Sequence, residues 1–427
     1  MKKYNIIFPL FLLLLACTSC MDKYTEVFRA YSPVYMSYED LRSSVRETDP
    51  RSLVNTGKIY FKDNYIFINE KFKGVHIIDN TSPSHPVNLG FIEIPGNADI
   101  AIKNNILYAD SYVDLVALDI SDVNDIREVD RVKDIFAYTL PPTENDNYRI
   151  AEIDEKKGVV TGWELKKVRQ KLENNYYPIY WGYRDDINTV YTLSEAVATP
   201  TGTTFGVGGS MARFGLYDDY LYAVDQSNLY MFDVKTDNHP EGIGKQNVGW
   251  AIETMFIYDG RMFFGTQSGM VVYSLEVPTL PDYIGQFWHV TSCDPVVVSD
   301  GYAYITLRGG NTCGGAVNRL DVLQLSENYT GNKLLASYPM NGPYGLGVDG
   351  DILFVCDGDA GLKVYDTTDK LNIDDHKIAT FPGINAFDVI PVNGTLFMIG
   401  EDGFYQYDYS NLQDIKLLSF IPIEANN

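Results

Sequence analysis

One pattern repeats seven times along this chain. Each copy contains an apolar, strand-like run, and the runs align on their last residue, at Asp79, Asp119, Asp233, Ser274, Gln324, Asp366 and Asp408. The steps between these residues are 40, 114, 41, 50, 42 and 42. Four steps lie near 41, the step of 50 holds a local insertion, and the step of 114 holds one large insertion or a degenerate eighth copy. Such a period indicates a fold in which every repeat is one structural unit.

A two-residue turn recurs before the second strand of each copy. Asn, Asp and Gly make up these turns, at 63–64, 104–105, 218–219, 259–260, 300–301, 350–351 and 393–394. These residue types accept the positive φ that tight hairpins need. Four short strands in each unit of about 40 residues are typical of a propeller blade. We therefore predict an all-β fold, a β-propeller of seven four-stranded blades with one β-rich insertion. A linear solenoid is the alternative, but ring closure protects the sheet edges better.

The repeats also divide the chain into segments. The propeller spans 53–425, and its blades are expected at 53–95, 96–136, 206–250, 251–291, 292–342, 343–384 and 385–424. The insertion at 137–205 follows the second blade and is expected to be β-rich, because Trp163 and Trp181 need other side chains to pack on. Residues 21–52 are polar and Tyr-rich, and we interpret them as a tether with one short helix in SYEDLRSSV.

The first twenty residues are typical of an export signal. Lys2 and Lys3 precede the apolar run Ile6 to Ala16, which is too short to span a bilayer. The following ACTSC resembles a bacterial lipobox, in which cleavage leaves an acylated cysteine at the new N-terminus. Cys20 is the preferred lipidation site and Cys17 the alternative, while a plain secretory signal is also compatible. We expect a lipoprotein signal peptide at 1–20 and a protein anchored by lipid at the bacterial outer membrane or cell surface.

Three cysteines remain after such a signal is removed. Export to an oxidising compartment permits a disulfide, and we predict one between Cys293 and Cys313, since both fall at the same end of the fifth repeat. Cys356 lies within the apolar run ILFVC and is predicted to be a small buried hydrophobe rather than a nucleophile.

The run LVALDIS, its relatives in the other copies and the Asn/Asp-x-x-Tyr turn resemble those of the LVIVD-repeat β-propeller proteins found among bacterial surface lipoproteins. The resemblance covers about residues 50–425. It implies a propeller and a surface location, but no ligand, because that family is largely uncharacterised. Ser274 and Gln324 replace the Asp that ends the strand in the other copies, so this Asp serves the turn rather than catalysis.

Three features gather at the end of the ring where the innermost strands begin. The insertion leaves and returns there, and the loop RGGNTCGGAVN lies there too. Polar residues also start the innermost strands, and the candidate ligand-binding residues are Asp99, Arg213, Glu253 (or Thr254), Asp294 and Asp388. Acids also follow the second strands, at Glu70, Asp110, Asp225, Asp357, Asp359, Glu401 and Asp402. A charged ring around a channel mouth predicts a ligand site. The alternative is that each acid only satisfies backbone N–H groups at a loop.

The charge of −23 argues against nucleic acid as a partner, because phosphates need neutralisation by Lys and Arg. The sequence holds no G-x-S-x-G, H-E-x-x-H or phosphate-loop motif, so catalysis is uncertain and disfavoured. We expect a monomeric, non-catalytic binding module for a glycan, a peptide or an envelope protein. The alternatives are a polysaccharide enzyme with paired carboxylates, and a scaffold without any small-molecule site. No cofactor is expected, although Asp357 and Asp359 form a weak Ca²⁺ candidate without the full calcium-loop pattern.

Overall fold

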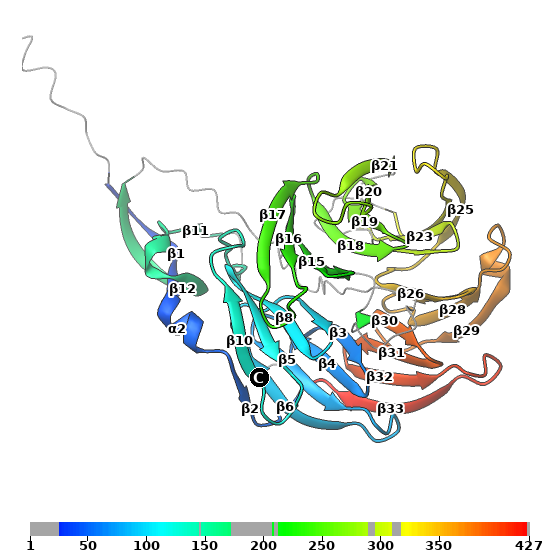
Figure 1. The fold of residues 1–427 in the computed structure, drawn as a ribbon, viewed down its shortest axis with the longest axis horizontal. Coiled ribbons are helices and arrows are strands. Elements are labelled where there is room, and N and C mark those ends of the chain that lie inside the picture. Colours follow the sequence, from blue (N-terminus) through cyan, green and yellow to red (C-terminus); the bar gives the residue numbers. More distant parts are fainter. Residues whose placement is uncertain are drawn as a thin grey trace, which may run out of the picture.

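The computed structural model describes residues 25–144, 147–171, 207–208, 212–288, 295–309 and 317–424. Across these residues, seven antiparallel four-stranded meanders are arranged in a ring (Figure 1). The predicted all-β propeller of seven blades is therefore confirmed. The blades, numbered 1 to 7 along the chain, begin with β3, β7, β14, β18, β22, β26 and β30, their innermost strands.

The strand bounds follow the repeat. Blades 1 to 3 are β3 (Thr56–Lys62), β4 (Tyr65–Glu70), β5 (Gly74–Asp79) and β6 (Val87–Glu93); β7 (Ile100–Lys103), β8 (Ile106–Ser111), β9 (Asp114–Asp119) and β10 (Arg127–Val132); β14 (Phe214–Tyr217), β15 (Tyr220–Val224), β16 (Asn228–Asp233) and β17 (Glu241–Asn247). Blades 4 and 5 are β18 (Ile252–Tyr258), β19 (Arg261–Thr266), β20 (Gly269–Ser274) and β21 (Asp282–Trp288); β22 (Val296–Ser299), β23 (Tyr302–Leu307), β24 (Arg319–Gln324) and β25 (Lys333–Pro339). Blades 6 and 7 are β26 (Leu346–Asp349), β27 (Ile352–Cys356), β28 (Leu362–Asp366) and β29 (Lys377–Phe381); β30 (Ala386–Val392), β31 (Thr395–Gly400), β32 (Gly403–Asp408) and β33 (Lys416–Pro422).

The predicted turns join the first and second strands of every blade. The first residue of each turn has a positive φ, between 46° and 56°, and these residues are Asp63, Asn104, Asp218, Asp259, Asp300, Gly350 and Asn393. Asn, Asp and Gly tolerate this left-handed region better than other residues do. The turn chemistry therefore sets the register of each innermost hairpin.

The hydrophobic core lies between neighbouring blades. One cluster, for example, packs Tyr108 and Leu115 of blade 2 against Phe214 and Leu221 of blade 3. The two middle strands are buried on both faces, whereas the outer strands, such as β10, are largely exposed. Each blade thus covers the apolar face of the next, and a single blade could not bury its own.

The ring closes between blade 7 and blade 1. Leu53 forms a parallel bridge with Ile423, and the Glu424 N–H donates to the Leu53 carbonyl at 2.8 Å. Side chains of both blades share one buried cluster, in which the rings of Phe61 and Phe397 stack at 4.9 Å. The linear solenoid is therefore excluded.

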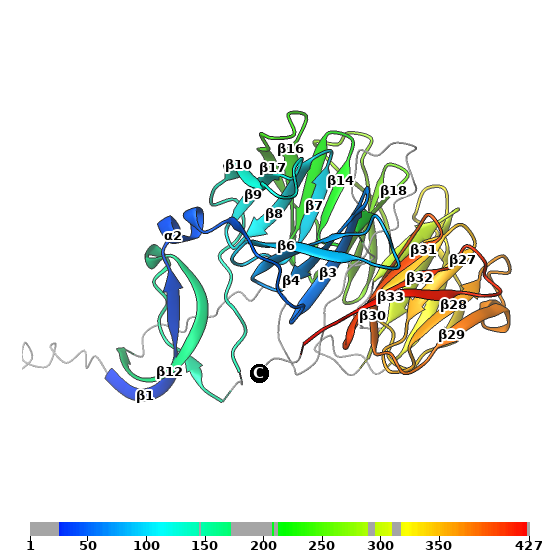
Figure 2. The same ribbon diagram turned by 90° about the horizontal axis from the view of Figure 1, so that it is seen from below.

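The N-terminal segment and the insertion form a sheet of their own. The segment interpreted as a tether contains β1 (Thr25–Met36), α2 (Tyr38–Ser43) and β2 (Arg46–Thr48). Strand β1 pairs antiparallel with β12 (Val159–Lys171) of the insertion and parallel with β11 (Arg149–Ile150). Figure 2 shows this sheet beside the propeller. The described part of the insertion is therefore β-rich, as predicted.

Two further strands pair with the edges of blade 1. Strand β2 pairs with β6 and extends blade 1 outwards, and β13 (Val207–Gly208) pairs with β3.

Trp163 packs with Leu140, Ile153 and Val160, and its indole N–H donates to the Pro141 carbonyl at 2.9 Å. Trp181 lies outside the described residues.

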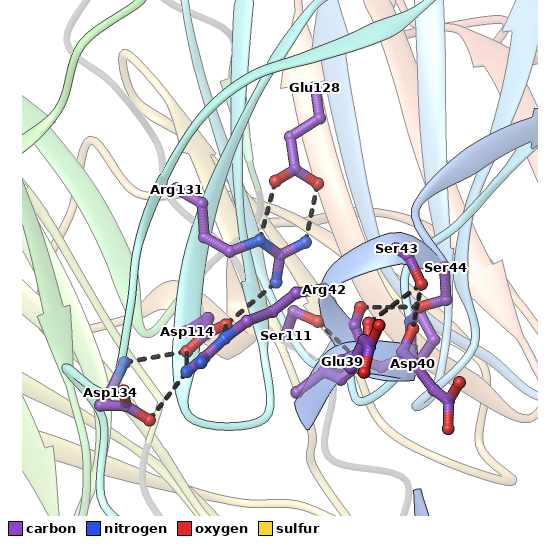
Figure 3. A network of polar contacts seen from close by, with 12 residues as sticks. Glu39, Asp40, Arg42, Ser43, Ser44, Ser111, Asp114, Glu128, Arg131 and Asp134 are labelled. Carbon is purple, nitrogen blue, oxygen red and sulfur yellow. Dashed lines mark hydrogen bonds and ion pairs between the residues drawn. The ribbon is translucent and has the colours of Figure 1, made fainter. Parts of the chain in front are cut away.

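An ion-pair network fixes α2 to blade 2 (Figure 3). The Arg42 guanidinium donates to both oxygens of Asp114, at 2.9 and 3.1 Å, and to Asp134 at 2.8 Å. Arg131 also donates to Asp114, at 3.1 Å. Burial by itself would raise the pKa of Asp114, but these hydrogen bonds hold it below its usual value. The segment before the first blade is thus attached through a buried carboxylate.

Candidate binding site at the mouth of the ring

The first hairpin of each blade defines one equivalent position at or just before the start of the innermost strand. It lies four residues before the residue that closes the hairpin pairing, such as Lys62 opposite Tyr65 or Lys103 opposite Ile106. Going round the ring from blade 1 to blade 7, the position holds Lys58, Asp99, Arg213, Thr254, Pro295, Gly345 and Asp388. We call this set the ring position.

Three predicted site residues occupy the ring position, namely Asp99, Arg213 and Asp388. Glu253 precedes it in blade 4, where Thr254 holds the position. Asp294 precedes Pro295 in blade 5 and lies outside the described residues. Lys58 was not among the predicted site residues, although its place four residues before Lys62 identifies it in the sequence. Blades 7, 1, 2 and 3 therefore carry alternating charges, and blades 4 to 6 carry uncharged residues.

Asp99 connects three blades at the mouth. The Lys58 Nζ of blade 1 lies 2.5 Å from Asp99 Oδ2, and the same oxygen accepts the backbone N–H groups of Arg213 and Phe214 in blade 3, at 2.7 and 3.0 Å. Burial lowers the pKa of Lys58 to about 8, against the opposing effect of Asp99. The positive charge of Arg213 lowers this pKa further. The Asp99 carboxylate is therefore bonded to groups of the protein itself.

Asp110, at the end of the second strand of blade 2, is also satisfied internally. Its Oδ1 accepts the backbone N–H groups of Ala98 and Asp99, at 2.9 and 2.8 Å, and the side-chain amide of Asn97 at 3.0 Å. Burial raises the pKa of Asp110 to about 6, although the backbone hydrogen bonds oppose the shift. This carboxylate shapes the loop that begins the innermost strand.

Asp388 lies at the ring position of blade 7 and is fully buried. Its Oδ1 accepts the Val389 N–H at 2.8 Å. A Cβ atom on Gly345, the ring position of blade 6, would lie 2.5 Å from this oxygen, so the glycine makes room for the carboxylate. Burial raises the pKa of the nearby Cys356 thiol, and Asp388 and Asp357 add to the effect. Cys356 itself is buried, as predicted for a small hydrophobe.

Other acids predicted after the second strands are also bonded within the protein. Glu70 is bonded to His76 and Lys73, and Asp225 accepts the backbone N–H groups of Ser227 and Asn228. Asp357 Oδ1 accepts the Asn341 and Gly342 N–H groups at 2.9 Å, and its Oδ2 lies 2.5 Å from Lys363 Nζ.

These contacts bear on the Ca²⁺ candidate. Hydrogen-bond donors and a lysine surround Asp357, whereas a calcium ion needs free oxygen ligands. Within the described residues, no group of three or more His, Cys, Asp or Glu side chains is arranged to hold a metal ion.

The groups on this end that reach solvent differ from the buried acids. Glu253 is half-buried and accepts the Gln267 side-chain amide at 3.2 Å. Arg308 lies over the ring of Tyr344 at 4.0 Å, and the Asn385 amide donates to Glu401 at 2.8 Å. Burial raises the pKa of Tyr344, against the effect of Arg308. Arg308 and Tyr344 were not predicted, because Arg308 follows β23 and Tyr344 precedes β26 at positions that no repeated residue marks.

Several predictions fall on residues outside the described part of the chain. They are the lipidated Cys20 or Cys17 and the disulfide between Cys293 and Cys313. No helix within the described residues has the length and apolar character needed to cross a membrane.

The chain resembles solved structures in its fold. No protein-family model matches the chain, and no curated protein matches its sequence. Sqt1 of Saccharomyces cerevisiae aligns with a TM-score of 0.49 and 7% identity, over 89% of this chain and 88% of Sqt1. A putative 6-phosphogluconolactonase of Bacteroides fragilis aligns at 0.47 and 8%, over 72% and 79%. BamB of Moraxella catarrhalis aligns at 0.43 and 10%, over 79% and 80%. At such low identity the likeness concerns architecture alone.

Proposed function

We propose that this chain is a non-catalytic recognition module of the cell envelope, which binds its ligand at the end of the ring where the innermost strands begin. One observation carries the proposal. The buried carboxylates Asp99, Asp110 and Asp357 accept hydrogen bonds from the protein itself, so they hold the blades in register and are not presented to a substrate.

The enzyme alternative has less support. Hydrolysis of a glycosidic bond needs two carboxyl groups flanking that bond, one to donate a proton and one to act as nucleophile or base. Of the carboxylates suggested for this role, Asp99 is 2% exposed and Asp388 is 0% exposed. Glu253 is half-buried and bonded to Gln267. The available groups suit hydrogen bonding and stacking better than proton transfer to a substrate.

Arg308, Tyr344 and Glu401 provide the test of the binding end. The purified chain is incubated with soluble polysaccharides and with peptide libraries, and both retention of the ligand and release of reducing ends are measured. We expect retention without release, and we expect Arg308→Ala and Glu401→Ala to weaken it. Lys416→Ala is the matched control, since this exposed lysine starts β33 at the other end of blade 7. Release of reducing ends by the wild type would refute a non-catalytic role.

The proposed location is a lipid-anchored one, with Cys20, or alternatively Cys17, as the acylated residue. Acyl chains hold a protein at a membrane in proportion to their buried methylene groups. Metabolic labelling with a fatty acid, followed by membrane fractionation, tests this. We expect Cys20→Ala to abolish the label and Cys17→Ala to preserve it; the reverse result would assign Cys17, and label in both single variants would argue against lipidation at one defined cysteine.

A further inference from the structure

Two tryptophans are exposed on blade 4, at the same end of the ring as the candidate site. Trp250 is 71% exposed and Trp288 is 53% exposed. Trp250 lies in the connection from β17 to β18, and Trp288 is the last residue of β21. A tryptophan exposed to water leaves a large apolar surface uncovered, and tryptophans are enriched where proteins bind a partner.

The backbone holds Trp250 in place. The N–H groups of Val248 and Ile252 donate to the carbonyls of Ser227 and Gln226, each at 3.0 Å, so both ends of the connection are attached to the neighbouring loop of blade 3. The Gln267 N–H donates to the Ala251 carbonyl at 3.2 Å and attaches the same connection to blade 4. The indole is therefore presented on a backbone fixed at both ends, which lowers the entropy lost when a ligand binds.

Trp288 lies across the same loop of blade 4. It pairs with Gly269, the first residue of β20, while Gln267 follows the end of β19. A Cβ atom on Gly269 would lie 2.1 Å from the Phe287 carbonyl oxygen, so the close approach of β21 depends on the glycine. Strands β18 and β21 are three strand spacings apart, or about 14 Å. Trp250 and Trp288 thus lie on opposite sides of the top of blade 4.

Polar side chains lie at the strand ends between the two tryptophan positions. Glu253 and Gln267 form a hydrogen-bonded pair at 3.2 Å, beside Ser268 in the loop. Apolar platforms that alternate with a carboxylate and an amide complement a sugar chain, whose rings have an apolar C–H face and a hydroxylated edge. A protein partner would instead favour a continuous apolar patch around the aromatic anchors. The net charge of −23 disfavours an acidic polymer.

We propose that Trp250 and Trp288 form a subsite for an uncharged oligosaccharide that lies across the top of blade 4, with Glu253 and Gln267 bonding to its hydroxyl groups. The inference rests on the proposed function, because it names the ligand class of the same binding end. Blade 4 gives the ligand its apolar contacts, and the ring position beside it carries no charge at Thr254.

Affinity electrophoresis of the purified full-length chain tests the inference, with galactomannan, xyloglucan, amylopectin and dextran as neutral probes and polygalacturonate as the acidic one. We expect at least one neutral polysaccharide to retard the chain and polygalacturonate not to. Trp250→Ala and Trp288→Ala should each weaken binding at least tenfold. Leu280→Ala is the matched control, since Leu280 is 67% exposed in the β20–β21 turn at the opposite end of the same blade.

The outcomes separate the two proposals. Full retention by both tryptophan variants, or retardation by polygalacturonate alone or by none of the probes, overturns the blade 4 subsite and leaves the recognition role to its own test. Release of reducing ends together with loss of binding in the tryptophan variants supports the subsite and refutes the non-catalytic role. Tryptophan fluorescence of each variant in buffer and in urea shows that the variants are folded, so loss of binding cannot be attributed to unfolding.

Discussion

Lys58 Nζ lies 2.5 Å from Asp99 Oδ2, and both side chains are 2% exposed. The pair joins the innermost strands of blades 1 and 2, and the same oxygen accepts two backbone N–H groups of blade 3. The Asp99 carboxylate of blade 2 therefore links three consecutive blades, because its ammonium partner belongs to blade 1 and its two backbone donors belong to blade 3.

Removing the cation of this pair should destabilise the ring. Lys58→Met leaves Asp99 buried without its ammonium partner, and we expect the free energy of unfolding to fall by about 3 kcal/mol. Urea unfolding followed by circular dichroism measures the loss. The double variant Lys58→Met/Asp99→Asn should recover part of it, since it removes both buried charges. Strictly additive losses would argue against a direct interaction.

Asp110 should make stability depend on pH. Its pKa is raised from 3.8 to about 6 in the folded protein, so the folded state binds the proton more tightly than the unfolded state. Its stabilising contribution is then complete below about pH 4 and is lost as the pH rises through about 6, by on the order of 3 kcal/mol. Asp110→Asn keeps an oxygen acceptor but cannot ionise. Relative to the wild type, its urea midpoint should rise between these pH values, and a constant difference would contradict the expectation.

The contact between α2 and blade 2 should depend on the fork geometry of Arg42. Arg42 Nε and Nη2 lie 2.9 and 3.1 Å from the two oxygens of Asp114. A lysine has a single nitrogen and cannot reproduce these two parallel hydrogen bonds. We expect Arg42→Lys and Arg42→Ala to increase cleavage of residues 21–50 in limited proteolysis severalfold. Arg46→Ala is the control, because its pair with Glu93 is exposed and contributes little. Equal cleavage in all variants would show that the network does not hold the segment.

The glycine beside Asp388 should not tolerate a side chain. In Gly345→Ala the new Cβ would lie 2.5 Å from Asp388 Oδ1 and 2.9 Å from the Phe387 carbonyl oxygen. We expect a loss of about 1–3 kcal/mol from this overpacking. At Gly342, three residues earlier, a Cβ would meet nothing within 4 Å. Thermal unfolding of the two alanine variants makes the comparison, and similar melting temperatures would contradict it.

The repeat in the sequence determines the architecture of this protein. The alignment of seven strand ends and seven Asn, Asp or Gly turns predicted the blades, because a two-residue turn fixes hairpin register from local sequence alone. Those turns have the positive φ that their residues suggested. The ring position was also predictable, since it lies five residues before the first turn residue in every blade.

Tertiary structure decided what the charged residues at that end do. Asp99 is a polar residue at a strand start in the sequence, and only the approach of Lys58 and of the Arg213 and Phe214 N–H groups turns it into a buried structural group. The pairing of Thr25–Met36 with Val159–Lys171 is likewise invisible in local patterns, because strand alternation shows which face is apolar but not which distant strand is the partner. The local residue pattern therefore determines the blades, whereas contacts between distant parts of the chain determine the role of the charged residues where the innermost strands begin.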